Sequence, residues 1–156
     1  MAKSINDIDR IIKQLANISN KVAKEAAPKI DKLFKESVRY AIMDFYASYE
    51  PMSYERTLNF MKVTDSANTT VSKNIITLSV NNDLMNDYPG FSNKPLSKDT
   101  AFDFMFQNGE HGHGKYLMAV STSPLLQIEN DIDSMFAGRA EKILIDAQNK
   151  ILNSIF

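Results

Sequence analysis

The residues whose type and spacing come closest to a chemical site are the two histidines, His111 and His113. On a strand, residues two apart point to the same side, so both imidazoles could bind one divalent cation. Glu110 or Asp103 would supply a third ligand. The pattern therefore indicates one candidate enzyme, a small metal-dependent one centred on the two histidines.

The glycines around this pair favour a simpler interpretation. Gly109, Gly112 and Gly114 make the segment flexible, whereas a closed metal site holds three or four ligands rigidly. Neither HExxH nor another spaced ligand set occurs in the sequence. We therefore expect a glycine-rich surface loop with exposed histidines and no metal or cofactor. The enzyme using His111 and His113 remains the less favoured alternative.

Other catalytic and phosphate-binding patterns are also missing. The chain has no cysteine, which excludes disulfides, thiolate metal sites and cysteine nucleophiles. It contains no G-x-S-x-G elbow, no G-x-x-x-x-G-K-[ST] loop and no G-x-G-x-x-G loop. The stretch "GEHGHGK" shares glycines with such loops but not their context. We predict that the protein is not an enzyme.

Charge is distributed unevenly although the formal net charge is only −1. Residues 1–40 carry nine Lys or Arg and five Asp or Glu, whereas residues 101–156 carry four and seven. Opposite signs at the two ends indicate helices that lie together or subunits that meet head to tail, unless both are ordinary solvated faces. The small net charge provides no global field for nucleic acid or acidic membranes.

The sequence shows no membrane or export signal. Asp7, Asp9 and Arg10 stand where a signal peptide needs an apolar run. No stretch approaches the roughly 20 apolar residues that span a bilayer. We expect a soluble protein without a membrane partner.

An apolar stripe at helical spacing predicts that residues 1–49 are helical. Its first members are Ile5, Ile8, Ile12, Leu15, Val22 and Ala26. The same period resumes at Ile30 and reaches Phe45. Pro28 interrupts it, because proline lacks an N–H and its ring clashes with the preceding turn. Either one long helix kinks at Pro28 or a second helix begins there.

Residues 50–122 are predicted to hold a small antiparallel sheet. The stretch "TLNFMKVT", residues 57–64, indicates a first strand with Leu58 and Phe60 on one face. Residues 71–82 alternate as a second strand, and "KYLMAVST", residues 115–122, indicates a third. We expect the first two strands to form a hairpin whose turn falls within residues 65–70.

Residues 81–115 are the least regular part of the chain. They hold two of the five prolines and four of the five glycines. The span is too long for a loop that only connects two elements. The stretch "TAFDFMFQN" within it is either strand-like or a short helical turn. We expect a functional or interface loop, unless its rings are intramolecular core. Its candidate contact residues are Phe102, Phe104, Phe106 and Tyr116.

Residues 123–156 have the clearest helix signals. Ser123 is a suitable N-cap, and Pro124 at the first helical position loses nothing by lacking an N–H. Gly138 falls within the apolar stripe and marks either a kink or a close backbone approach. Helices at both ends with strands between them indicate a single α+β domain over residues 1–156.

The junction between the first helix and the strands, "FYASYEPMSYERTLNF" at residues 45–60, is rich in tyrosine. Tyr46 and Tyr49 can bury their rings while keeping their hydroxyls near water. Pro51 stops the helix, and Arg56 has five donors to hold helix carbonyls or a loop. These residue types predict a structural corner between helix and sheet rather than a catalytic site.

The corner resembles a known motif. The pattern Tyr46-x-x-Tyr49-x-Pro51-x-x-Tyr54-x-Arg56-Thr57-x-x-Phe60 is similar to the "Y-x-P-x-x-Y-x-R-T-x-x-L" signature of the HK97 gp10-like tail-completion and neck proteins of tailed bacteriophages. Phe60 stands where an aliphatic residue is usual. The family's order of a long helix, this motif, an antiparallel sheet and a closing helix matches the order predicted above.

The resemblance implies a non-enzymatic virion protein that forms a ring at the head–tail junction. Its implied partners are copies of itself and other neck, portal-adaptor or tail proteins, around a DNA channel without sequence-specific binding. The implied location is the virion, and the host cytoplasm during assembly. The motif positions, Tyr49, Pro51, Tyr54, Arg56 and Thr57, would set the corner on which ring contacts are built. A minor capsid or decoration protein is the nearest alternative.

Overall fold

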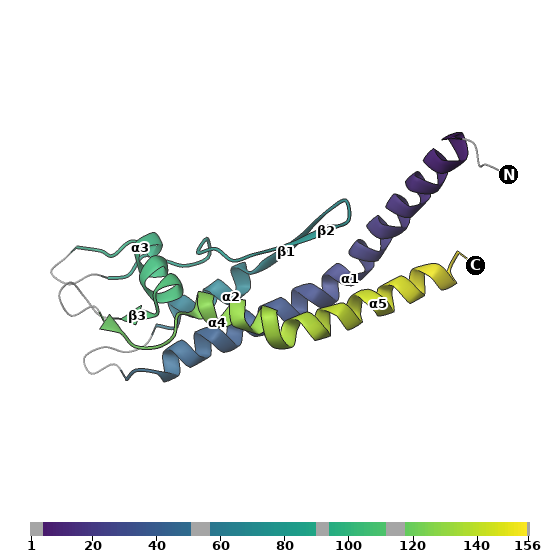
Figure 1. Cartoon of the computed structure of the whole chain (residues 1–156). Coiled ribbons are helices and arrows are strands. Elements are labelled where there is room, and N and C mark those ends of the chain that lie inside the picture. The colour runs from purple at the N-terminus through teal and green to yellow at the C-terminus, as the bar shows by residue number, and fades with distance from the viewer. Residues whose placement is uncertain (1–4, 51–56, 90–93, 112–117, 156) are drawn as a thin grey trace.

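The computed structural model describes residues 5–50, 57–89, 94–111 and 118–155. Its architecture is α+β, as predicted. The long helix α1 (Ile5–Ala47) and the C-terminal helix α5 (Ala137–Asn153) lie along each other, and the smaller elements gather over the C-terminal half of α1 (Figure 1). Towards the two termini, α1 and α5 diverge (Figure 1).

The N-terminal region is one helix rather than two. α1 runs through Pro28, which is exposed, so the position that lacks an N–H faces away from the core. The helix changes direction along its length, as expected for a helix with an internal proline (Figure 1). Of the two predicted arrangements, the structure therefore has the single long helix.

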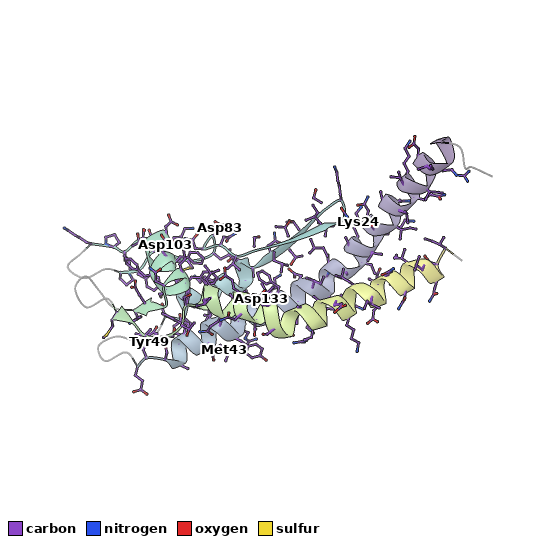
Figure 2. The ribbon with its side chains drawn as sticks, in the orientation of Figure 1. Lys24, Met43, Tyr49, Asp83, Asp103 and Asp133 are labelled. Carbon is purple, nitrogen blue, oxygen red and sulfur yellow. The ribbon has the colours of Figure 1, made fainter. Side chains whose placement is uncertain are left out.

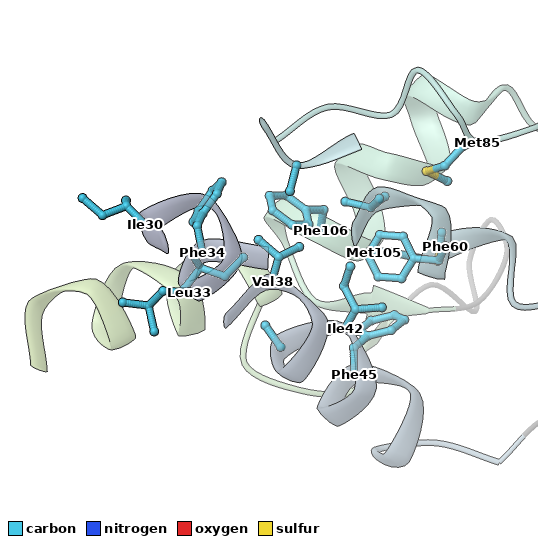
Figure 3. Packing of buried hydrophobic residues seen from close by; sticks show 14 of the residues in the cluster. Ile30, Leu33, Phe34, Val38, Ile42, Phe45, Phe60, Met85, Met105 and Phe106 are labelled. Atoms are coloured by element: carbon cyan, nitrogen blue, oxygen red, sulfur yellow. The ribbon is translucent and has the colours of Figure 1, made fainter. Parts of the chain in front are cut away.

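The core lies on one side of the second half of α1. Val38, Ile42 and Phe45 are fully buried there and meet Phe60 from the segment that follows the corner (Figure 3). The remaining buried members of this cluster are spread from the middle of α1 to α5: Ala26, Ile30, Leu33, Phe34, Ala41, Val63, Ala67, Met85, Ala101, Met105, Phe106, Ile128 and Ala147.

The first predicted strand is wrong. Residues 57–64 instead contain the 3-10 turn η1 (Asn59–Met61) and lead into the short helix α2 (Lys62–Ser66). Phe60 and Val63 are both fully buried, a spacing of three that suits a helical turn. Asn59 fixes the turn, because its side-chain amide donates to the backbone oxygen of Asn86 at 2.7 Å and its oxygen accepts from the Asn86 N–H at 2.9 Å.

The hairpin is present, but its first strand lies later in the chain than the predicted first strand. Strand β1 (Asn68–Ser72) pairs antiparallel with β2 (Ile75–Ser79), with Asn68 opposite Ser79. The turn is at Lys73–Asn74, where Lys73 has a φ of 56°. The polar segment that suggested a turn at residues 65–70 thus includes the start of a strand. Both strands alternate between half-buried and exposed residues, as a hairpin covered on one face does.

Of the third predicted strand, residues 118–122 are described, and only the first two of them form a strand. β4 (Met118–Ala119) pairs with β3 (Glu110–His111) in a separate two-stranded sheet, not with the hairpin. In the described part of the chain, the predicted single sheet is therefore two small antiparallel sheets.

The stretch "TAFDFMFQN" in the irregular region is helical rather than a strand. α3 (Lys98–Phe102) is capped by Ser97, whose hydroxyl accepts from the Thr100 N–H at 3.2 Å. It continues into a π turn, η3 (Asp103–Gln107). Of the two interpretations of "TAFDFMFQN", strand or short helical turn, the helical turn is correct.

The C-terminal helix begins as predicted. Ser123 caps α4 (Pro124–Asp131) by accepting from the Leu126 N–H at 3.1 Å. A π turn, η5 (Ile132–Phe136), joins α4 to α5. A Cβ added at Gly138 would meet nothing within 4 Å, so the predicted close backbone approach is wrong there. None of the described helices has both the length and the apolar character needed to cross a membrane.

Replacing Phe45 by alanine tests the position of the core. Phe45 is fully buried at the C-terminal end of α1. Phe45→Ala should therefore lower the free energy of unfolding by about 3–5 kcal/mol in urea denaturation. Met43, two residues earlier and 47% exposed, is the matched control, and Met43→Ala should change it by less than about 1 kcal/mol. Equal effects of the two substitutions would contradict the placement of the core.

Candidate functional site

The aromatic corner is a packed cluster at the end of α1. The ring of Phe45 lies edge to face against Tyr49 at 5.4 Å and against Phe60 at 5.3 Å between centroids. Tyr46 also contacts Phe45 and Phe60, at 6.2 Å from each. Edge-to-face aromatic pairs add about 0.5–1.5 kcal/mol beyond area burial. The cluster therefore joins the end of the helix to Phe60 in the segment that follows it.

One histidine of the candidate metal site belongs to this cluster. The imidazole of His111, in β3, stacks on the ring of Tyr49 with centroids 3.9 Å apart (Tyr49 is labelled in Figure 2). The stack joins the segment after α1 to the β3–β4 sheet, and no pattern in the sequence predicts this contact. His113 lies outside the described residues.

The other motif residues are placed only in part. α1 already ends at Ala47, and Ser48 Oγ donates to the Phe45 backbone oxygen at 2.5 Å. Thr57 is exposed, and its hydroxyl accepts from the Asn59 N–H at 3.4 Å. Pro51, Tyr54 and Arg56 lie outside the described residues.

The predicted metal ligands do not converge among the described residues. Asp103 accepts from the Gln107 side-chain amide at 2.8 Å, and Glu110 accepts from that of Asn108 at 3.4 Å. Within the ranges that the structure describes, no three His, Asp or Glu side chains lie close enough together to hold a metal ion.

The glycines around the histidines do not form a phosphate-binding loop. Residues 109–115 have the spacing G-x-x-x-x-G-K, but Tyr116 stands where that motif needs Ser or Thr. Glu110 and His111 within it are paired in β3, and the strand β4 follows where a phosphate loop leads into a helix. Gly109 has a packing role, because its φ is 65° and an added Cβ would lie 2.5 Å from the Ser121 oxygen.

Two of the described phenylalanines of the irregular region, Phe102 and Phe106, pack in or against the core. Phe106 is buried, and Phe102 stacks on it with centroids 4.7 Å apart. These two rings therefore do not form an exposed contact surface. Phe104 is half-buried, and Tyr116 lies outside the described residues.

An apolar surface without a covering element lies elsewhere, on the N-terminal half of α1. Ile8, Ile12 and Leu15 continue the stripe that is buried from Ala26 onward, yet they are 48%, 57% and 59% exposed. We call residues 8–18 of α1 the arm. Figure 1 shows it extending beyond the hairpin and away from α5.

A second uncovered apolar surface lies on α5. Leu144, Ile145 and Ile155 are 38%, 48% and 46% exposed. At 100° per residue, Ile145 lies about 160° around the helix from Ala147, which is buried against the rest of the protein. We call these three residues the α5 face. Complete burial of one Leu or Ile stabilises by about 1.5–3 kcal/mol, so each side chain in the two surfaces leaves roughly 1 kcal/mol unrealised.

An open groove adjoins both surfaces. It has a volume of about 410 Å³ and lies between α1, the hairpin and α5. Its lining residues are Ile18, Ser19, Val22, Ala23, Asn74, Ile76, Leu144 and Gln148. The arm begins where this groove ends, so the uncovered stripe is a continuation of the core beyond its last covering element.

The ion pairs between α1 and α5 do not follow the net charge of residues 1–40 and 101–156. Lys150 Nζ on α5 lies 2.6 Å from a carboxylate oxygen of Glu25, and Arg139 lies 3.7 Å from Glu36. The helices do lie together, but these pairs do not come from the regional charge difference. The acids come from the basic region and the bases from the acidic one.

The chain was also compared with known proteins. The YomN family model matches residues 4–154. The chain belongs to the YomN family. YomN is a phage-derived family of the SPbeta/Bacillus prophage type, which indicates a phage protein. The YomN match supports the phage part of the resemblance described above and not the HK97 gp10-like group specifically. No curated protein and no solved structure matches the chain.

A double-mutant cycle tests the link between Tyr49 and His111. Each single alanine substitution should destabilise the protein, and the cycle should show a coupling of about 0.5–1.5 kcal/mol in urea unfolding, because the two rings stack directly. Tyr40 is 65% exposed, and Tyr40→Ala should not couple with His111→Ala. Additive effects at positions 49 and 111 would show that the stack contributes nothing.

Proposed function

We propose that the chain is a non-enzymatic structural protein of a tailed phage, a tail-completion or neck component that acts as a ring at the head–tail junction. The observation that carries the proposal is the pair of uncovered apolar surfaces, the arm and the α5 face, on a protein of a phage-derived family. Assembly covers such surfaces, whereas a stable monomer rarely exposes large contiguous ones.

The aromatic corner supports the same function. The motif that resembles the tail-completion and neck signature contains Tyr46 and Tyr49, and both rings belong to the cluster that fixes α1 to the rest of the fold. A ring subunit needs such a rigid joint, because it must hold its contact surfaces at a fixed angle to each neighbour. The corner therefore serves assembly by orienting the long helix.

The proposal includes the partners and the location. Copies of the chain form the ring, and other neck, portal-adaptor or tail proteins contact it around the DNA channel. Its net charge of −1 suits a channel component that does not bind DNA sequence-specifically. The protein acts in the virion and is assembled in the host cytoplasm.

Purified particles test the function directly. We expect a phage or induced prophage that encodes an epitope-tagged chain to release particles containing it. Gold-labelled antibody should mark the head–tail junction in electron micrographs. Deletion of the gene should yield filled heads without attached tails, with a loss of plaque-forming units of at least about 100-fold.

The label also separates the alternatives. Labelling spread over the head would indicate a decoration or minor capsid protein. Absence of the chain from particles, with normal particles after deletion, would contradict a structural role.

A further inference from the structure

We infer that the arm of one copy docks on the α5 face of a second copy, so that successive copies join head to tail. This inference rests on the proposed function, because it names the contact by which the ring would form. The occupant of the α5 face is thus an identical chain, and the contact joins two different surfaces.

The position of the two surfaces on the fold is the first argument. Within the α5 face, Ile145 points away from the side of α5 that packs on its own α1, where Ala147 is buried. Leu144 lies between these two sides and lines the groove. The arm of the same copy cannot cover Ile145 while α1 and α5 keep their observed packing. Only another molecule can, and an isolated apolar helix of the right kind is present on every copy.

The dimensions of the two surfaces are the second argument. The uncovered stripe from Ile8 to Leu15 spans roughly 11 Å of helix, and the α5 face from Leu144 to Ile155 spans roughly 17 Å. One arm therefore fits along one face. The groove beside Leu144 extends the face towards the hairpin, which gives a docked helix a second wall.

Charge complementarity is the third argument. Arg10, Lys13, Lys21 and Lys24 are exposed and, among the described residues, take no part in the ion pairs. Glu129, Asp133, Glu141 and Asp146 in the C-terminal region are likewise exposed and outside those pairs. Inside one protomer, these two groups are not used to join α1 to α5, so both remain available to a neighbour.

The arrangement of these charges suits a helix lying on the α5 face. Glu141 lies one turn before Leu144 and Ile145, on the same side of α5. The cations of the N-terminal region lie on the side of α1 opposite the stripe, so they do not interrupt the apolar contact. A helix is only about 10–12 Å across, so these charges stay within about one Debye length of the neighbouring surface and attract it.

A contact between two different surfaces has a consequence that a symmetric one lacks. In a head-to-tail contact, each copy uses its arm towards one neighbour and its α5 face towards the other, and the series closes into a ring if the rotation allows. A defect in either surface alone therefore blocks self-association. Two copies with different defects can still form one intact contact.

Mixing two variants tests this. Ile12→Lys places a charge in the arm stripe, and Ile145→Lys places the same charge in the α5 face. Wild-type protein should show concentration-dependent oligomers by size-exclusion chromatography with light scattering. Each variant alone should need at least tenfold higher concentration to associate. An equimolar mixture should give a 1:1 heterodimer at the concentration where each variant alone is a monomer.

Matched controls carry the same charge on other sides of the same helices. Asn17 lies about half a turn from the arm stripe, and Asn153 lies well away from the α5 face; both are exposed. Asn17→Lys and Asn153→Lys should associate as the wild type does. Circular dichroism should show unchanged helix content and thermal unfolding for all four variants.

Three results would overturn the inference. The first is a wild type that stays monomeric at all concentrations. The second is either stripe variant associating like the wild type, and the third is a mixture that forms no heterodimer. An arm-to-arm contact would appear as Ile145→Lys protein that still dimerises alone.

Failure of the proposed function can be distinguished from failure of the contact between the arm and the α5 face. A chain that enters particles with Ile12→Lys in place would overturn only this contact. A chain absent from particles would overturn the function even if the mixture behaves as expected.

Discussion

The structure depends on how far the apolar stripe of α1 can be buried. From Ala26 to Phe45 the stripe is covered by the hairpin, the helices α2 and α4, and α5, which all contact α1 directly. Before Val22 the covering elements end, but the helix and its stripe continue. The same physical feature therefore forms the core in one half of α1 and an uncovered surface in the other.

Packing of aromatic rings makes the corner after α1 rigid. The rings of Phe45, Tyr46, Tyr49 and Phe60 pack mostly edge to face, and His111 adds a contact from a strand some sixty residues further along the chain. Asn59 adds directional hydrogen bonds to Asn86, which hold the following turn against the irregular region. The long helix is thus fixed at its C-terminal end, and any movement of the arm is transmitted to a joint that resists bending.

Charge has a smaller role inside the protomer than its uneven distribution suggests. The ion pairs Glu25–Lys150 and Glu36–Arg139 lie on partly exposed surface, where such pairs contribute roughly 0–1 kcal/mol. Apolar contacts hold α1 and α5 together, with Ala147 buried between them. Most of the other charges stay exposed on the surface and take no part in these pairs.

Local signals in the amino-acid sequence are enough to predict several elements. The periodic stripe of α1, the cap formed by Ser123 and Pro124, and the α+β order follow from side-chain spacing and backbone chemistry that act within one or two turns. The residues of the arm were identified in the same way. The phage association followed from residue types at fixed spacing in the corner, and the YomN match covers nearly the whole chain.

The other features follow from the folded structure, because they depend on contacts between residues that are distant in the sequence. The alternation of Leu58 and Phe60 indicated a strand, but burial of Phe60 with Val63 and the bonds of Asn59 to Asn86 made it a turn and a helix. The register of the hairpin and the stacking of His111 on Tyr49 likewise need partners far away in the sequence. A periodic apolar stripe shows which side chains would be stabilised by burial. Whether a partner covers them is a property of the whole fold, which is why the exposed state of Ile8, Ile12 and Leu15 could not be deduced from their spacing.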